Sequence, residues 1–328
     1  MRLTFFCPSN RRPVGGIKVI YRLAQLCDEL LGNSGEARVL HPNQPWTRYT
    51  WFDSRPKLTR KLFRLRWEDK PALTGIGKHF SADKDIVVLP EIWVRKYGKQ
   101  LADRGIPFAI LVQGGYLLAK GKRSDLDQTY AAAKLILSVS DNTQACIEQA
   151  FPFTSGKIRR LCLHVDASKF SPSAAKENLI SFMPRKLPDH ISLWKFFLAP
   201  YLPSHWKLRG IEGLSEQGVA ELLSKSRIFL STSHLEGLGL PPIEAALAGN
   251  LVLGYTGEGG KEYWHPPLFH PVPHGDLVTL ANKTIALTRE LDRQDAPSLH
   301  KARQALAARF SEEAHRHSVE QFLNDLLA

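Results

Sequence analysis

Two glutamates, Glu236 and Glu244, enclose a turn rich in glycine and proline in the stretch HLEGLGLPPIEAALAGN, residues 234–250. The apolar run RIFLSTS before it predicts a strand. The pattern IEAALA after the two prolines predicts a helix that ends at Gly249. We therefore expect Glu236 in the loop and Glu244 in the first helical turn. Carboxylates placed there would be good hydrogen-bond acceptors for hydroxyl groups.

The same turn has the features of an anion site. The N–H groups at the start of a helix lack partners within the helix, and together with the helix dipole they attract phosphate. Gly237 and Gly239 would let the backbone approach an anion without a side chain in the way. An anion alone does not need two acids beside it. A ligand that carries phosphates between hydroxylated rings, such as a sugar nucleotide, satisfies both features.

Each acid also has an ordinary structural explanation. Glu244 in a first helical turn would gain about 0.3–1 kcal/mol from the helix dipole alone, and Glu236 could be a solvated loop residue. The loop, the glycines, the prolines and both acids occur together at the end of one strand, however. This combination favours a ligand site.

Short apolar runs that alternate with helical patterns organise most of the chain. Their near-continuous apolar character is typical of parallel strands covered on both faces. The expected strands are Leu3–Cys7, Val39–Leu40, Ile86–Pro90, Phe108–Val112, Leu135–Val139, Leu179–Met183, Lys207–Ile211, Ile228–Ser231 and Leu251–Tyr255. The sequence therefore predicts an α/β protein with two Rossmann-like parallel sheets, which bind ligands at the carboxyl ends of their strands.

A polar, proline-containing stretch, DASKFSPSAAK, divides the chain and is interpreted as a linker. We expect an N-terminal domain over residues 1–170 and a second domain over residues 171–310. An amphipathic helix over residues 311–328, with Ser311 as its N-cap, is expected to pack back towards the N-terminal domain.

The chain carries 44 lysines and arginines against 32 aspartates and glutamates in 328 residues, a formal charge of +12. Such an excess favours an anionic partner. No nucleic-acid-binding module is recognisable, so we expect no nucleic acid. The basic run RPKLTRKLFRLRW, residues 55–67, could form a helix with Leu58, Leu62 and Leu65 on one face. That helix could be solvated, or it could rest on an anionic membrane surface.

Several features argue against a metal, a disulfide or a membrane span. Asp83 and Asp85 precede a strand, which favours a polar strand start over a metal site, and the proline-rich loop with His265, His270 and His274 favours an exposed loop. No stretch approaches the roughly 18 apolar residues of a spanning helix, and no signal peptide is evident. The cysteines, interpreted as reduced thiols of a cytosolic protein, are Cys7, Cys27, Cys146 and Cys162.

The segment EGLGLPPIEAALAG resembles the signature of the retaining GT-B glycosyltransferases of family four, in which seven residues separate two glutamates. Four further segments resemble parts of the same family: LILSVSDNT, LHVDASKF, ISFMPRKLPDH and YTGEGGKEYW. In the second of these, His164 stands where the family commonly has glycine. The resemblance covers most of the chain and is strongest between residues 135 and 265. It implies two Rossmann-like domains that face a cleft.

The resemblance also implies how a donor would be bound. Glu244 would hold the ribose hydroxyls, and Glu236 would contact a hydroxyl of the donor sugar. Backbone N–H groups of four consecutive residues would approach the sugar and the diphosphate: Gly237, Leu238, Gly239 and Leu240.

Two cations and one further loop complete the implied donor site. Arg185 and Lys186 would neutralise the departing diphosphate, because fixed cations stabilise charge that develops in the transition state. Their adjacency leaves open which of the two is the main contact. The loop that contains Gly213 would meet the base. With these cations in place a metal is unnecessary, and we expect neither a metal nor a cofactor.

The N-terminal domain would bind the acceptor. Gly15 and Gly16 form the first strand-to-helix turn, where a glycine pair could also serve only to make a tight turn. Gln113 follows a strand at its carboxyl end, in a region where some family members have a histidine. No carboxylate nucleophile is evident, which favours a same-face displacement in which the leaving phosphate accepts the proton of the acceptor.

The expected function is that of a retaining, metal-independent, hexosyl-type glycosyltransferase. It would move a sugar from a nucleotide-diphosphate donor to a glycan or lipid-linked glycan in surface polysaccharide synthesis, such as lipopolysaccharide or capsule. The expected location is the cytoplasm, with peripheral association at the inner face of the cytoplasmic membrane left open. The alternatives are a non-catalytic nucleotide-sugar-binding protein and a sugar-nucleotide epimerase of the same fold. The sequence leaves the base, the sugar, the acceptor and the linkage open.

Overall fold

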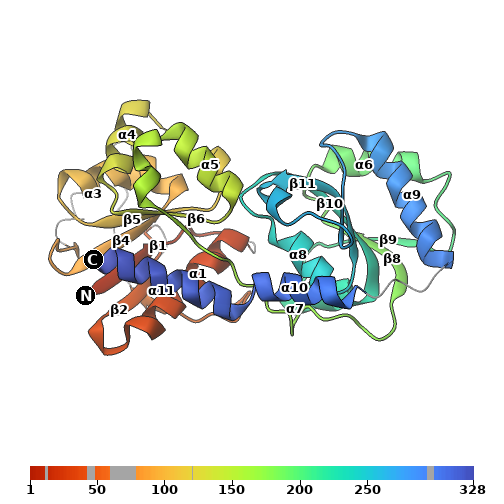
Figure 1. The fold of residues 1–328 in the computed structure, drawn as a ribbon, viewed down its shortest axis with the longest axis horizontal. Coiled ribbons are helices and arrows are strands. Elements are labelled where there is room, and N and C mark those ends of the chain that lie inside the picture. The colour runs from red at the N-terminus through yellow and green to blue at the C-terminus, as the bar shows by residue number, and fades with distance from the viewer. Residues whose placement is uncertain (12–13, 43–48, 60–78, 120, 294–298) are drawn as a thin grey trace. The chain divides into compact units, whose positions relative to one another are not determined.

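The computed structural model describes residues 1–11, 14–42, 49–59, 79–119, 121–293 and 299–328. They form two compact units. Unit 1 comprises Met1–Leu163 together with His315–Ala328, and unit 2 comprises His164–Ala314. Figure 1 labels their helices and strands.

Unit 1 is built on a parallel sheet, whose described strands follow the order β3-β2-β1-β4-β5-β6-β7. These strands are β1 (Arg2–Phe6), β2 (Glu36–Leu40), β3 (Lys57–Thr59), β4 (Asp85–Pro90), β5 (Phe108–Val112), β6 (Leu135–Ser138) and β7 (Ile158–Arg160). Every residue of β4 and β5 is buried. This confirms the covered strands that the apolar runs predicted.

Helices accompany this sheet, and all but the last of them lie between its strands in the chain (Figure 1). They are α1 (Gly15–Leu31), α3 (Lys99–Asp103), α4 (Arg123–Ala132), α5 (Asp141–Ala150) and α11 (Glu312–Leu327), of which the part from His315 belongs to unit 1. The Ser311 hydroxyl accepts a hydrogen bond from the N–H of Ala314 at 3.1 Å, which confirms the predicted N-cap of α11. Further along α11, the carbonyl of Leu326 accepts from Nζ of Lys134 on unit 1 at 2.9 Å.

Unit 2 contains a second parallel sheet, with the order β12-β11-β10-β8-β9 among the described residues. Its strands are β8 (Glu177–Phe182), β9 (Lys207–Gly210), β10 (Ser226–Glu236), β11 (Leu251–Glu258) and β12 (Phe269–Pro271). Its helices are α6 (Pro188–Leu198), α7 (Glu216–Lys225), α8 (Leu240–Leu247), α9 (Leu277–Arg293) and α10 (His300–Arg309). Helices α6 and α9 pack together on one face, and α7, α8 and α10 pack on the other (Figure 1).

The basic run of residues 55–67 needs a correction in its first part. Lys57–Thr59 form the edge strand β3, in which Lys57 pairs with Arg38 of β2, and not the first turn of a helix. Pairing with an exposed sheet edge thus prevails over the leucine periodicity of this segment. Residues 60–67 lie outside the described residues.

Asp85 stands at the start of β4, as expected for a polar strand start. Its buried carboxylate accepts from Arg2 at 2.7 Å and from the N–H of Ser81 at 2.8 Å. No disulfide joins any of the four cysteines; Cys7 and Cys27 are buried, and Cys146 and Cys162 are half-buried. Within the described residues, no helix combines the length and the apolar character needed to cross a bilayer.

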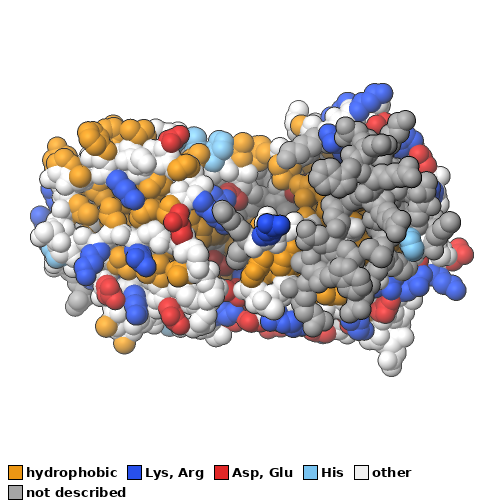
Figure 2. Space-filling view, turned by 180° about the vertical axis from the view of Figure 1, so that it is seen from behind, with side chains coloured by type: hydrophobic (Ala, Val, Ile, Leu, Met, Phe, Trp, Pro, Cys, Tyr) orange, Lys and Arg blue, Asp and Glu red, His pale blue; other side chains and the backbone are white. Residues whose placement is uncertain are grey.

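Figure 2 shows hydrophobic side chains gathered over the part of unit 2 that carries α6 and α9. The exposed members from α6 and the turn after it are Leu193, Phe196, Phe197 and Tyr201.

Candidate functional site

The strand order of unit 2 creates a switch point between β8 and β10. The chain leaves β8 towards β9 on one side, and it leaves β10 towards β11 on the other. Loops that diverge in this way from the carboxyl ends of neighbouring parallel strands form the usual ligand-binding crevice of such sheets. Arg185 and Lys186 lie in the loop after β8, and Gly237 to Gly239 form the loop after β10.

The turn between β10 and α8 differs in two ways from the expectation. β10 continues to Glu236, with an irregular register between Ser233 and Glu236, so that this acid ends the strand instead of standing free in a loop. α8 begins at Leu240, ahead of the prolines, so that Glu244 lies one turn inside the helix and not in its first turn. The side chain of Glu244 is correspondingly buried, at 9% exposure.

The local sequence explains why the chain reverses here. Gly239 has φ = +81°, a conformation that costs other residues about 1–2 kcal/mol. The prolines that follow it occupy the first helical turn, where no N–H is needed. The turn and the start of α8 therefore lie at the switch point; Leu240 has an N–H there, whereas Pro241 and Pro242 have none.

A second loop, after β11, holds this turn in place. A Cβ atom added to Gly259 would lie 1.9 Å from the carbonyl oxygen of Gly237, which means that the two backbones are in direct contact. The buried hydroxyl of Tyr263 donates to the carbonyl of Gly239 at 2.6 Å and lies 3.2 Å from that of Leu238. Sequence reasoning quoted this loop, YTGEGGKEYW, for its resemblance to the family but gave neither Gly259 nor Tyr263 a role, although the Gly259–Gly260 pair was a signal for close backbone approach.

The structure brings Lys186 and Glu236 together as an ion pair, with Nζ of Lys186 on Oε1 of Glu236. The hydroxyl of Thr232 on β10 donates to the backbone carbonyl of Lys186 at 2.7 Å and fixes the loop after β8. Arg185 is exposed and forms no ion pair with any described residue. The pair is partly exposed, at 35% and 27% of the two side chains, so it contributes little to stability. It places one positive and one negative charge beside the turn.

Buried polar side chains secure the other end of α8. Asn250 is fully buried, and its amide donates to the carbonyls of Leu223 at 2.8 Å and Ala245 at 2.9 Å. Its carbonyl oxygen accepts from the hydroxyl of Ser226 at 2.5 Å. These bonds satisfy carbonyls at the ends of α7 and α8 that no helical N–H reaches. Asn250, the last residue of the stretch that suggested the site, therefore has a structural role.

Three histidines that sequence reasoning did not group lie together on the α6 side of this sheet edge. The ring of His274 lies 4.5 Å from that of His234 and 5.5 Å from that of His190. Nδ1 of His190 is 3.1 Å from the hydroxyl of buried Tyr255. Burial, then the neighbouring His234 and His190, lower the pKa of His274. No group of three potential metal ligands is arranged to hold an ion in the described parts of the chain.

Unit 1 brings its predicted residues together at its own switch point, between β1 and β4. Gly15 and Gly16 open α1, and Gln113 directly follows β5. Nε2 of Gln113 donates to the carbonyl of Gly16 at 3.1 Å. A Cβ on Gly16 would lie 3.3 Å from Oε1 of Gln113, a close contact that a small shift of the Gln113 side chain would relieve.

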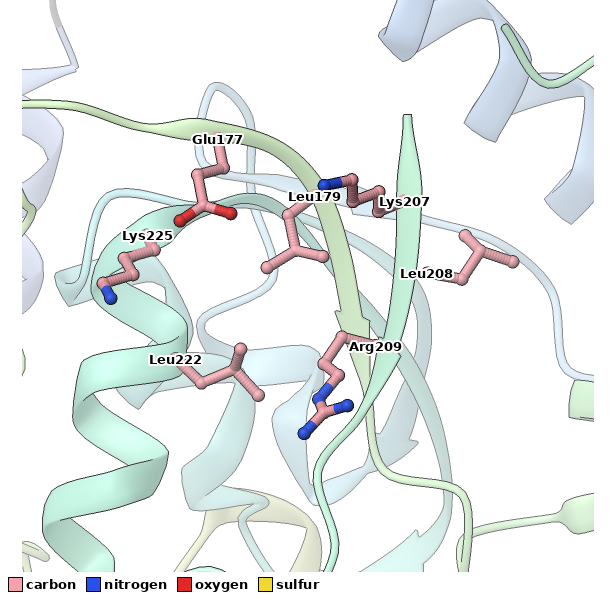
Figure 3. Close-up of a pocket in the computed structure, with 7 residues that line it drawn as sticks. All are labelled: Glu177, Leu179, Lys207, Leu208, Arg209, Leu222 and Lys225. Atoms are coloured by element: carbon pink, nitrogen blue, oxygen red, sulfur yellow. The ribbon is translucent and has the colours of Figure 1, made fainter. Parts of the chain in front are cut away.

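Gly213 lies in an exposed loop between β9 and α7 and has φ = +65°. Near this edge of the sheet, a hollow of about 590 Å³ opens between β9 and α7 (Figure 3). It is lined by Glu177, Leu179, Lys207, Leu208, Arg209, Leu222 and Lys225. Because Glu177 and Leu179 belong to the amino-terminal half of β8, the hollow is distinct from the loops at the carboxyl ends that carry the predicted site residues.

Comparison with known proteins gives one partial match in sequence and several in fold. No family model matches the chain. It is 34% identical over 92 residues to an alpha-1,6-glucosyltransferase of Actinobacillus pleuropneumoniae serotype 7, strain AP76. This match covers 27% of the chain and 28% of that protein, so the chain matches well under two thirds of its relative.

Two solved structures resemble the protein over almost its whole length. Anabaena HepE, solved with UDP and glucose, has a TM-score of 0.73 at 14% identity, with 99% of each chain covered. The lipopolysaccharide outer core galactosyltransferase WaaB has a TM-score of 0.70 at 12% identity, with 100% of this chain and 99% of the other covered. At such identities these matches establish the fold, which is that of the GT-B glycosyltransferase structures, and confirm the predicted α/β class with two parallel sheets.

Proposed function

We propose that the protein is a retaining, metal-independent glycosyltransferase. It would move a hexosyl group from a nucleoside-diphosphate donor to a glycan or lipid-linked glycan acceptor. The observation that carries this proposal is the switch point of unit 2, where the start of α8, a lysine and two acids occur together. The partial match to an alpha-1,6-glucosyltransferase and the likeness to HepE, solved with UDP and glucose, support the same class of reaction.

In this proposal the donor binds to unit 2. The N–H groups from Gly237 to Leu240 take the diphosphate and the sugar, because that backbone is held from behind by Gly259 and Tyr263. Glu244, in the second turn of α8, takes the ribose hydroxyls. The loop with Gly213 takes the base.

The cations beside the turn stabilise the leaving group. Arg185 is exposed and unpaired among the described residues, which makes it the main contact of the diphosphate. Lys186 remains on Glu236, and the ion pair holds this carboxylate in position for a hydroxyl of the donor sugar. Fixed charges of this kind act most strongly on the charge that develops in the transition state.

The reaction is a same-face displacement. The bond between the anomeric carbon and the phosphate oxygen breaks, and its electron pair leaves with the nucleoside diphosphate. The acceptor hydroxyl forms the new bond on the same face, and its proton passes to the departing phosphate oxygen. The products are the glycosylated acceptor, with the anomeric configuration retained, and the nucleoside diphosphate.

Unit 1 takes the acceptor in this proposal, at the start of α1, where Gln113 donates to the carbonyl of Gly16. The acceptor is a growing surface polysaccharide, and the protein works in the cytoplasm at the inner face of the cytoplasmic membrane. The fold likeness to WaaB, whose printed name places it in lipopolysaccharide synthesis, supports this class of acceptor.

The first test is thermal unfolding in the presence of UDP, GDP, ADP, CDP and dTDP. At a concentration 100 times its Kd, the matching diphosphate stabilises the native state by about 2.7 kcal/mol. Calorimetry with that diphosphate should show weaker binding for Glu244→Ala. Binding should be near normal for Glu236→Ala and for the control Glu221→Ala on the exposed side of α7.

The second test is turnover. Glu236→Ala should lower donor hydrolysis or transfer, and proton NMR should show the released sugar in the anomeric form of the donor. If none of the five diphosphates stabilises the protein, the proposed donor class is wrong. If Glu244→Ala binds the matching diphosphate as the wild type does, the ribose assignment is wrong.

A further inference from the structure

Backbone strain in residues other than glycine is concentrated at one edge of unit 2. Among the described residues, only Leu187, Leu235 and Glu258 combine a side chain with a positive φ, at 49°, 46° and 67°. Leu187 lies in the loop after β8, Leu235 is the penultimate residue of β10, and Glu258 is the last residue of β11. Leu187 and Leu235 directly adjoin Lys186 and Glu236. Strain of this kind persists where the surrounding structure imposes it, and it is typical of functional sites.

Glu258 has a conformation that proteins rarely give to a residue with a side chain. Its φ of 67° and ψ of −64° are those of the rare, strained type of γ-turn. Glycine reaches positive φ without this steric cost. The sequence supplies glycine at every other position of the run Gly257–Gly260, so that Glu258 is the one residue there with a side chain.

The contacts on both sides of Glu258 fix this conformation. A Cβ on Gly257 would lie 3.1 Å from Cγ of Glu236. A Cβ on Gly259 would lie 1.9 Å from the carbonyl oxygen of Gly237. In the sheet, Glu258 also pairs with Glu236, the last residue of β10. The backbone at Glu258 therefore cannot relax without moving the turn of the candidate site.

The ion pair of Glu258 does not account for its side chain. Oε2 of Glu258 lies 2.6 Å from Nζ of Lys261, but the two side chains are 34% and 63% exposed. Ion pairs exposed to this degree contribute little to stability. Glycine at position 258 would remove the strain and would lose only this weak pair. The presence of a carboxylate at this position therefore favours a role in binding over a role in folding.

The carboxylate of Glu258 lies among groups that can bind hydroxyls. Glu236 ends the neighbouring strand, and on the α6 side the ring of His274 lies 4.5 Å from that of His234. Both histidines are exposed. Burial and then the neighbouring histidines lower the pKa of His274, whereas the charge of Glu258 raises it, so that the carboxylate lies within electrostatic range of this ring. Carboxylates accept hydrogen bonds from hydroxyls, and a neutral imidazole both donates and accepts them.

We propose that Glu258 is a sugar-contacting residue of the donor site, and that its carboxylate accepts a hydrogen bond from a hydroxyl of the transferred hexose. Glu236 takes one hydroxyl, and Glu258, its partner in the register of β10 and β11, takes a second. A site built to bind a hydroxyl strongly rejects an analogue that lacks it, so Glu258 selects which hexose is accepted. The inference rests on the proposed function, because it adds a residue to the donor site of that function.

The test compares the full-length wild type with Glu258→Gln, Glu258→Gly and Lys261→Gln. Glutamine keeps the size of the side chain and removes its charge, whereas glycine removes both the side chain and the strain. Lys261→Gln is the matched control, because it removes the ion pair and leaves the carboxylate. The donors are the nucleotide hexose that the wild type uses and its deoxy analogues, each of which lacks one hydroxyl of the hexose.

We expect Glu258→Gln and Glu258→Gly to lower kcat/KM for the intact donor at least about tenfold, because a hydrogen bond to a charged group is lost. Lys261→Gln should stay within about twofold of the wild type, since an exposed ion pair is weak. All four proteins should bind the free nucleoside diphosphate equally in calorimetry, because it carries no hexose. Glu258→Gly should melt no lower than the wild type, which a structural role would not allow. One deoxy analogue should be used equally by the wild type and by Glu258→Gln, and it identifies the hydroxyl.

Three outcomes would overturn the assignment of Glu258 and leave the proposed function intact. The first is an unchanged kcat/KM of Glu258→Gln with the intact donor, and the second is an equal loss in Lys261→Gln. The third is weaker binding of the free diphosphate by Glu258→Gln, since the contact would then not be with the sugar. A wild type that no nucleoside diphosphate stabilises would instead overturn the donor class itself, and the assignment of Glu258 with it.

Discussion

The substitution Gly259→Ala tests whether the loop after β11 positions the turn of the candidate site. The added Cβ would lie 1.9 Å from the carbonyl oxygen of Gly237 and 2.7 Å from that of Glu236. Ordinary contact begins at about 3.4 Å, so the turn must retreat by 1.5 Å, the difference between 3.4 and 1.9 Å. Because both obstacles are backbone atoms, no change of rotamer can absorb this shift. Gly259 does not have a positive φ, so the substitution tests steric contact alone.

The expected effect falls on function more than on folding. A displacement of about 1 Å in a positioned group can reduce turnover by about 10²-fold, whereas overpacking costs about 1–3 kcal/mol of stability. Calorimetry with the matching nucleoside diphosphate and a turnover assay measure the first effect, and urea unfolding measures the second. Gly156→Ala is the control, since a Cβ there meets nothing within 4 Å.

Two results would refute this reasoning. A Gly259→Ala protein that binds the diphosphate and turns over like the wild type would show that the loop does not position the turn. Equal losses in Gly259→Ala and Gly156→Ala would show that the effect is not specific to the site.

Further predictions concern charge, pH and capping. Arg185→Gln should weaken binding of the matching diphosphate about tenfold in calorimetry, because a hydrogen bond to a charged group contributes about 1.5–3 kcal/mol. Lys186→Gln should mainly lower turnover, because it removes the ion pair that holds Glu236. Burial lowers the pKa of His41 to about 4 from 6.5. Between these two values the unfolded chain binds a proton that the native protein does not, so about 3 kcal/mol of stability should be lost as the pH falls from 6.5 to 4. The urea midpoint of His41→Gln should therefore change less over this pH range than that of the wild type. Identical pH profiles of the two proteins would contradict the prediction. Asn250→Ala should lower the free energy of unfolding by about 2–3 kcal/mol, because it removes two hydrogen bonds to buried carbonyls and the acceptor of the Ser226 hydroxyl. A free energy of unfolding from urea titration within about 0.5 kcal/mol of the wild type would count against that role.

Local sequence determined much of the fold and part of the site. The strands were predictable because β4, β5 and their neighbours are apolar runs covered on both faces. The turn before α8 was predictable because a glycine with positive φ followed by two prolines leaves the chain few alternatives. The Ser311 cap is likewise a local interaction within one helical turn.

Other features depend on residues far apart in sequence and could not be predicted from one chain. The ion pair joins Lys186 to Glu236 across 50 positions. The His190, His234 and His274 cluster is assembled from three separate segments. β3 pairs with the edge of β2, and the sequence of Lys57–Thr59 alone does not reveal that this edge is available. The roles of the donor and acceptor residues stay predictions until they are tested.

The path of the chain sets an order of assembly during synthesis. All strands of both sheets are made before α11, which nevertheless supplies buried Val319, Phe322 and Leu326 to unit 1. Unit 2 up to Ala314 is therefore translated in full while unit 1 still lacks a covering helix. Although N-terminal domains generally fold first during synthesis, unit 1 therefore cannot complete its fold until all of unit 2 has been synthesised.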